Sequence, residues 1–128
     1  TNLVFEPLVG ETFRSGFVQQ LAAVNGDYVT PVIIGAGEND FVRDLRYTKA
    51  LVTMLVNDGE HGKANVAMIN SWLDAYVPEV LAAVRLLQPI WSQPTEKVVT
   101  FETSLRNAVT RTSALLTELG LETKELGA

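Results

Sequence analysis

The chain has 128 residues, of which 47% are hydrophobic, which is typical of a single globular domain. A domain of this length can bury roughly two-thirds of the surface that its unfolded chain exposes. Fifteen acidic against ten basic residues give a formal charge of −5, and the scattered Lys and Arg residues argue against a nucleic-acid partner. The absence of cysteine excludes disulfides and thiolate metal sites and fits a cytoplasmic protein. No apolar run reaches the length of a membrane span.

The first predicted helix covers Leu3 to Val24. Pro7 predicts either a bend or the true start of this helix, and Gly26 suits the left-handed residue that follows its end. The abrupt apolar start and the missing initiating Met predict that the chain is a piece of something longer. A three-four spacing places on one face Val4, Leu8, Glu11, Ser15, Val18 and Ala22, and a second apolar face carries Phe13, Phe17, Leu21 and Val24.

The second helix is the longest that the sequence predicts. Thr30 is expected to cap it, Pro31 suits its first position, and it ends near Asn57. At 1.5 Å per residue it is roughly 40 Å long, which is typical of a long-helix bundle. Its inward stripe consists of Ile34, Glu38, Phe41, Leu45, Thr48, Val52 and Leu55.

Shorter helices are predicted to follow a break at residues 58–62. Helix resumes by about Lys63, with an inward stripe of Val66, Ile69, Leu73 and Tyr76. Pro78 is expected to start a separate helix, whose inward residues are Leu81, Val84 and Leu87, and Pro89 is expected to end it.

Residues 88–94 form a proline-stiffened connector, whose Trp91 is predicted to dock on the helices. The last helix is the most regular, with a stripe of Val98, Phe101, Leu105, Ala108, Thr112, Leu115 and Leu119. Gly120 fits the position after its end, and Leu121 could pack back on it in a Schellman stop. The polar tail from Glu122 is expected to be frayed.

The sequence contains few of the residue patterns that catalytic sites require. No Glu is followed three residues later by His, so the metal-ligand pattern natural to a long-helix bundle is absent. His61, the only histidine, lies between glycines in a predicted loop and is interpreted as solvated. The chain also lacks the residues of a nucleophilic triad.

Two carboxylates, Glu11 and Glu38, interrupt otherwise apolar stripes. They could form half of a metal site, but the favoured interpretation pairs them with Arg14, Arg43 or Arg46, or lets them reach solvent or a partner chain. Asp40, Asp44, Arg43 and Arg46 are predicted to form a solvated or interfacial ion-pair network. The remaining interface and packing candidates are Tyr47, Trp72 and Trp91.

Several segments together resemble the small, or beta, subunit of the hydroxylase of soluble bacterial diiron monooxygenases, in the propane, alkene and ketone oxidising branch. They are Asn25-Gly26-Asp27, Thr30-Pro31, the segment 44–48 (DLRYT) and the segment 88–94 (QPIWSQP). The resemblance covers nearly the whole chain. It implies an all-α, ferritin-like long-helix bundle, partial in this chain, with long antiparallel helices and shorter C-terminal helices. Residues 1–128 would be a single helical domain, the C-terminal portion of a longer subunit.

The family's catalytic large subunit has a related segment with a Glu-x-x-His pair that ligates iron. Counted from the shared landmarks, the Glu position falls on Phe41 and the His position on Asp44, and the upstream carboxylate falls near Pro7, beside Glu6. Phenylalanine offers a metal no lone pair. The resemblance therefore implies no catalytic, cofactor or metal ligand in this chain, and a metal position filled by a packed ring and an ion pair.

The resemblance implies a non-catalytic structural subunit of a monooxygenase hydroxylase. The diiron centre would lie in the large (alpha) subunit, and NADH would act through a separate reductase in hydroxylating a small hydrocarbon such as propane. The expected partners are the large subunit, a second alpha-beta pair and a coupling protein, without nucleic acid or membrane. A free-standing helical binding or scaffold module is the alternative. A ferritin-like oxidase is a third interpretation, which requires Glu11 and Glu38 to bind metal together.

Overall fold

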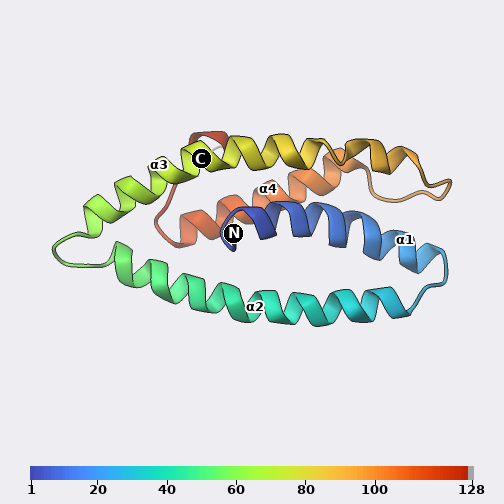
Figure 1. The fold of residues 1–128 in the computed structure, drawn as a ribbon, viewed down its shortest axis with the longest axis horizontal. Helices are drawn as coiled ribbons and strands as arrows, with labels where there is room; N and C mark the ends of the chain where they lie inside the picture. The colour runs from blue at the N-terminus through green and yellow to red at the C-terminus, as the bar shows by residue number, and fades with distance from the viewer. Residues whose placement is uncertain (127–128) are drawn as a thin grey trace.

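The computed structural model describes residues 1–126, and that part of the chain is helical with no β-strand. Figure 1 shows an elongated bundle in which α2 and α3 form the two outer rods, while η1 and α4 lie between them. The predicted all-α class of long antiparallel helices is confirmed. In chain order the elements are η1 (Glu6–Val18), α1 (Gln19–Val24), α2 (Val29–Val56), α3 (Gly62–Arg85), η2 (Gln88–Ser92), α4 (Phe101–Glu118) and η3 (Lys124–Leu126). Within residues 1–126, no helix is both long enough and apolar enough to cross a bilayer.

The first helix is wound differently from the prediction. Element η1 is a π-helix with Pro7 in its first turn, and at its end the N–H of Gln19 donates to the carbonyl of Arg14, five residues back. The wider turn moves the buried side chains to steps of about four residues, so Leu8, Thr12 and Gly16 are buried. The predicted α-helical stripe through Glu11, Ser15 and Val18 is therefore wrong, and these residues are only half-buried.

The turn between α1 and α2 is capped by a residue that the sequence pattern did not single out. Gly26 has φ +72°, as predicted for the residue after a helix end. The carboxylate of Asp27 accepts from the backbone N–H groups of Val29 and Thr30 at 2.9 and 3.0 Å, and from the Thr30 hydroxyl at 2.6 Å. The prediction that Thr30 caps the helix and Pro31 opens it is wrong, because Asp27 satisfies those donors and α2 begins at Val29.

Helix α3 passes through Pro78 without stopping. The prediction of a separate helix at this proline is wrong, because the helix continues from Gly62 to Arg85. A proline inside a helix removes one hydrogen bond and crowds the carbonyl four residues back, at a cost of about 3 kcal/mol, and burial of the neighbouring Val77 and of Val84 offsets that cost. The inward stripe is Leu73, Val77 and Val84, whereas Tyr76, predicted to face inward, is 61% exposed.

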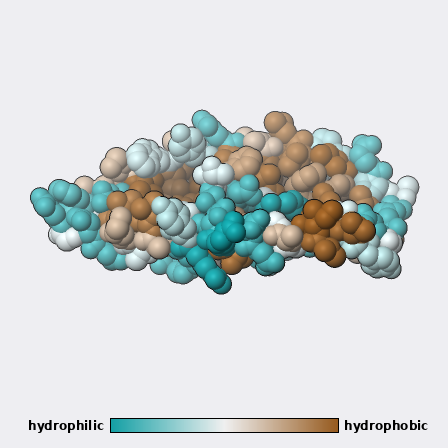
Figure 2. Space-filling model, turned by 60° about the horizontal axis from the view of Figure 1, so that its bottom comes forward, coloured by the Kyte–Doolittle hydropathy of each residue, from teal (hydrophilic) through white to brown (hydrophobic). Residues whose placement is uncertain are grey.

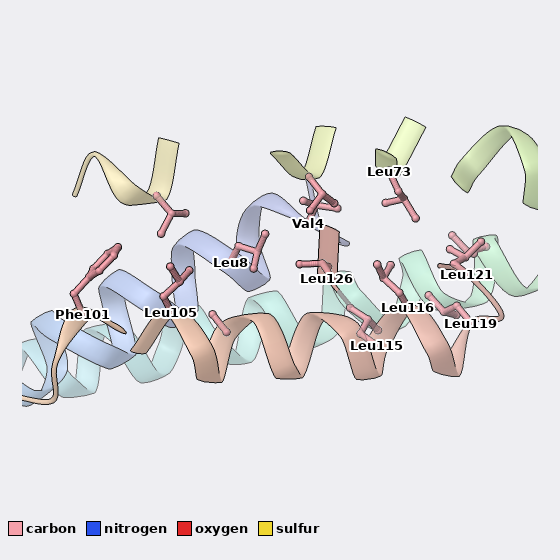
Figure 3. Packing of buried hydrophobic residues seen from close by; sticks show 14 residues of the cluster. Val4, Leu8, Leu73, Phe101, Leu105, Leu115, Leu116, Leu119, Leu121 and Leu126 are labelled. Atoms are coloured by element: carbon pink, nitrogen blue, oxygen red, sulfur yellow. The ribbon is translucent and has the colours of Figure 1, made fainter. Parts of the chain in front are cut away.

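Helix α4 is the core helix of the bundle. Seven of its residues are buried, and Figure 3 shows Phe101, Leu105, Leu115 and Leu116 pointing into one continuous apolar layer. Its predicted stripe is confirmed from Phe101 onward, but the helix starts three residues after Val98, because Thr100 caps it by accepting from the N–H of Thr103 at 3.2 Å.

The end of α4 has the geometry of a Schellman stop, as predicted. Gly120 has φ +70°, its N–H donates to the carbonyl of Thr117 at 3.0 Å, and the N–H of Leu121 donates to the carbonyl of Leu116 at 2.9 Å. Leu121 is 3% exposed and packs in the core cluster.

The tail after Leu121 is docked, so the prediction of a frayed end is wrong for residues 122–126. Asp74 on α3 accepts from the hydroxyl of Thr123 and from the N–H of Lys124, both at 3.0 Å. Leu126 is then 5% exposed within the core cluster. The short η3 segment thereby ties the chain end to α3 and α4.

The bundle depends on a close approach of η1 to α4. A Cβ placed on Gly16 would lie 2.6 Å from the Cβ of Ser104, so only glycine allows the two helices this separation. Because the side chains of both residues are small, Leu8 and Leu105 from the same two helices reach the shared core.

We predict that Gly16→Ala lowers the free energy of unfolding by about 1–3 kcal/mol, since the added methyl group forces η1 away from α4. Gly35→Ala is the matched control, because nothing lies within 4 Å of the place that its added methyl group would take in α2. There the gain in helix propensity should raise stability by up to about 1 kcal/mol. Urea denaturation measures both, and a stabilising Gly16→Ala would contradict the close-approach account.

The tail contact should weaken in acid. The N–H of Lys124, helped by the Thr123 hydroxyl and the Lys124 charge, holds the pKa of Asp74 below its ordinary 3.8. Because the unfolded state then binds the proton more tightly, this stabilisation is complete above pH 4 to 5 and is lost as the pH falls through the folded pKa. We expect the amide-exchange protection factors of residues 123–126, which correct for the intrinsic pH dependence of exchange, to fall in that range, and Asp74→Asn to remove this fall. Protection factors that do not change with pH in the unmodified protein would refute this.

Candidate functional site

The ion-paired junction between η1 and α2 is centred on Arg14. Its Nη2 lies 2.9 Å from Oε2 of Glu6, and its Nε lies 3.6 Å from Oε1 of Glu38 on α2. All three side chains are about one-third exposed, at 33%, 31% and 35%. The side chain crosses Gly10, where a Cβ would overlap the guanidinium. The missing side chain of Gly10 therefore makes room for a cation between two carboxylates.

Glu11 has a different partner. Its Oε2 lies 2.8 Å from Nη1 of Arg111 on α4, and the Glu11 side chain is 22% exposed. The structure thus brings Glu38 to Arg14, one of the predicted partners, while Glu11 pairs with an arginine that the sequence pattern did not single out. Arg111 is adjacent to Thr112 on the inward stripe of α4, which is the signal that could have placed it beside η1. Glu11 and Glu38 therefore have separate arginines as counter-charges.

The two positions that the resemblance aligns with iron ligands have unlike surroundings. Phe41 is half-buried on the inner side of α2, whereas the side chain of Asp44 is 58% exposed and lies 3.7 Å from Nε of Arg43. Across residues 1–126, no three His, Cys, Asp or Glu side chains group closely enough to hold a metal ion. His61 is exposed at the turn before α3, 3.9 Å from Glu60.

The other predicted interface candidates divide into an exposed and a packed group. Arg43, Arg46 and Tyr47 are exposed on α2, and Arg43 lies 3.3 Å from Asp40. Trp91 is half-buried on η2. Its ring lies 4.6 Å from that of Phe17 and 5.1 Å from that of Phe101, measured between centroids, and its Nε1–H donates to the carbonyl of Val99 at 3.0 Å. Trp91 therefore packs the connector between α3 and α4 against η1 and α4.

Helix α2 has a largely apolar outer side. Of its 28 residues only Val52 is buried, and side-chain polar contacts help to hold its inner side: Asn2 to Thr48 at 3.0 Å and Lys49 to Glu118 at 2.6 Å. Figure 2, which brings this side forward, shows hydrophobic side chains toward both ends of the face and hydrophilic ones between them. The large exposed apolar residues of α2 are Val29, Val32, Ile33, Val42, Tyr47, Leu51, Met54 and Leu55. Exposed apolar patches of this kind, bordered by polar residues, are typical of protein interaction surfaces.

An open groove of about 950 Å³ lies between the first residues of the chain and α3. Its aromatic wall consists of Phe5, Trp72 and Tyr76, which are 45%, 55% and 61% exposed. The groove is apolar and contains none of the ion-paired residues of the η1–α2 junction, so it is a second surface suited to binding and not to acid-base chemistry.

Comparison with known proteins finds relatives that match nearly the whole chain. Residues 1–59 match a family model described as Methane/Phenol/Alkene Hydroxylase. The small subunit of the propane 2-monooxygenase hydroxylase component is 53% identical in Mycolicibacterium goodii over 125 residues, 98% of this chain and 34% of that protein. In Rhodococcus jostii the same subunit is also 53% identical, over 95% of this chain and 33% of that protein. The chain is a relative of these hydroxylase small subunits.

The methane monooxygenase component A beta chain of Methylosinus trichosporium is a more distant relative, 32% identical over 59% of this chain and 20% of that protein. The resemblance to the hydroxylase small subunit is therefore confirmed. The chain spans about a third of the length of the propane 2-monooxygenase small subunits that it matches. The relatives are named as subunits, that is, as proteins that work in contact with other chains.

We predict that Arg14→Gln lowers the stability of this small-subunit relative by about 1–2 kcal/mol, because two carboxylates lose their counter-charge. Arg43→Gln, on the same bundle but 74% exposed, is the control and should change stability by less than about 0.5 kcal/mol. Thermal unfolding at low and high salt measures both effects. Equal effects of the two substitutions would contradict a structural role for the Arg14 junction.

Proposed function

We propose that this chain is a non-catalytic structural subunit of the hydroxylase of a multicomponent diiron monooxygenase. The observation that carries the proposal is the Arg14 junction: a guanidinium already pairs with Glu6, which is adjacent to the aligned upstream ligand position at Pro7, and with Glu38 on α2. Phe41, at the aligned ligand position, offers a ring and no oxygen donor. The two outer rods of the bundle then serve to support a neighbouring subunit.

The neighbouring large subunit would hold the diiron centre and the substrate. The whole assembly would hydroxylate a small hydrocarbon such as propane, as the names of the relatives suggest. Electrons from cytoplasmic NADH would arrive through a separate reductase, and a second alpha-beta pair and a coupling protein complete the expected partners. The chain itself would be a single helical domain, the C-terminal portion of the longer small subunit. Its contribution is mechanical, because its described charged groups are ion-paired or lie on the surface.

Co-expression with a large hydroxylase subunit tests this proposal. The two chains should co-purify as a stable complex, and after separation the iron should remain with the large subunit. The small subunit alone should neither bind stoichiometric iron nor oxidise propane. Two irons per small subunit, or turnover by the isolated small subunit, would overturn the non-catalytic assignment.

A free-standing binding module is the second candidate, and the groove lined by Phe5, Trp72 and Tyr76 favours it. Under this alternative the protein would be a stable monomer that is indifferent to the large subunit and binds a lipid-like ligand or a helix in the groove. Tryptophan fluorescence during titration with a fatty acid would report binding at Trp72. Co-purification with the large subunit without a fluorescence change would reject the alternative.

A further inference from the structure

The turn that joins α1 to α2 contains a reactive dipeptide, Asn25-Gly26. In such a pair the backbone nitrogen of the second residue can attack the side-chain amide of the first, because glycine has no side chain to obstruct the approach. Both residues are exposed at the end of the bundle (Figure 1), and nothing lies within 4 Å of the place that a Cβ on Gly26 would take. Neither the Arg14 junction nor the apolar groove uses this dipeptide.

Asn25 is the only asparagine in the sequence that is followed by glycine. Each of the others precedes a residue with a side chain: Asn2, Asn39, Asn57, Asn65, Asn70 and Asn107. Asn39 is the best comparison, because it is also exposed and lies on α2. The sequence therefore distinguishes Asn25 from the other asparagines by its neighbour.

The reaction open to this pair is deamidation. The Gly26 nitrogen gives its proton to hydroxide and forms a bond to Cγ of Asn25, the Cγ–Nδ2 bond breaks, and the side-chain nitrogen takes up a proton and leaves as ammonia. The product is a cyclic succinimide. One water molecule then opens the ring at either carbonyl, which leaves aspartate or isoaspartate at position 25. The reaction needs only water and base, with no oxidant or reductant.

The folded turn holds the reacting atoms apart. The backbone torsion ψ of Asn25 is 5°, so the Gly26 nitrogen lies on the side of the Asn25 backbone nitrogen and not on the side of Cβ, where ring closure requires it. The Asn25 side-chain amide donates to the carbonyl of Leu21 at 2.9 Å. The N–H of Gly26 donates to the carbonyl of Ala23 at 3.2 Å. The leaving group and the attacking nitrogen are therefore both bound to the last turn of α1.

We propose that Asn25 is a deamidation site whose reaction is controlled by opening of the C-terminal end of α1. The closed turn is unreactive, whereas an opened turn lets ψ rotate and releases both hydrogen bonds. Helix ends can open in this way without unfolding of the whole domain. The proposal goes beyond the proposed function and does not depend on it, because it uses only the turn between α1 and α2.

Deamidation would alter the attachment of α2. Aspartate at position 25 cannot donate to the Leu21 carbonyl, and its negative charge lies at the C-terminal end of α1, where the helix dipole disfavours it. Isoaspartate also routes the backbone through Cβ. Asp27 caps α2 two residues later, so the amides of Val29 and Thr30 should lose protection against exchange in the modified protein.

Peptide mapping of the purified protein after incubation in mildly alkaline buffer tests the proposal. Trypsin releases residues 15–43 as one peptide, which contains both Asn25 and the control Asn39. Heavy-oxygen water in the incubation labels each carboxylate that forms there, and electron-transfer fragmentation separates aspartate from isoaspartate. In urea, Asn25 should convert well before Asn39. In the folded protein, Asn25 should convert at least about tenfold more slowly than in urea, which corresponds to an opening free energy of about 1.4 kcal/mol.

Two exposed alanines provide matched variants that separate local from global opening. Ala23→Gly weakens the last turn of α1 by about 1 kcal/mol, so it should speed conversion of Asn25 in the folded protein roughly fivefold and leave the rate in urea unchanged. Ala50→Gly has the same effect on helix propensity in α2, away from the turn, and should leave the Asn25 rate unchanged in both conditions.

Three results would overturn the proposal. In the first, Asn25 stays intact in urea while Asn39 converts, so the dipeptide is not the reactive one. In the second, Asn25 converts equally fast in the folded and unfolded protein, so the turn does not restrain it. In the third, Ala23→Gly and Ala50→Gly accelerate the reaction equally, so global unfolding and not the α1 end controls it.

Discussion

The close contact between η1 and α4 is the constraint on which the rest of the structure depends. Gly16 and Ser104 let the two helices approach closely enough for Leu8 and Leu105 to share one apolar layer. The other elements are then added to this pair: α3 contributes Val77 and Val84, and the chain end contributes Leu126. The aromatic cluster around Trp91 closes the opposite end of the layer from that occupied by Leu121.

Helix α2 is organised on a different principle. It adds one buried residue to the core, and Leu45 and Val56 pack against that core. Polar contacts from Asn2, Arg14 and Glu118 supplement this packing. Such contacts position a helix without covering its apolar surface, and each contributes only modestly to stability. The outer side of α2 therefore carries apolar surface that the described residues of this chain do not cover. Most of the buried core is therefore formed by η1, α3, α4 and the chain end, whereas α2 contributes little to it.

Sequence periodicity predicted the helices well where α-helical winding holds. The inward stripe of α4 and the Gly120 stop followed from spacing and from the left-handed preference of glycine. The predicted inward stripe of η1 was wrong because a π-helix rotates by less than 100° per residue. No residue pattern within Glu6–Val18 indicates this winding. Asp27, Arg111 and Asp74 were missed as partners for two reasons: Asp27 competes with Thr30 within one turn, and the others act across long sequence separations.

The central claim is that a guanidinium, and not a metal, lies between Glu6 and Glu38 in this subunit. An anomalous difference map of the assembled hydroxylase, recorded at the iron absorption edge, tests it most directly. The account predicts iron peaks in the large subunit only, with Arg14 between the two carboxylates of this chain. A peak between Glu6 and Glu38, with the Arg14 side chain displaced from Gly10, would contradict it.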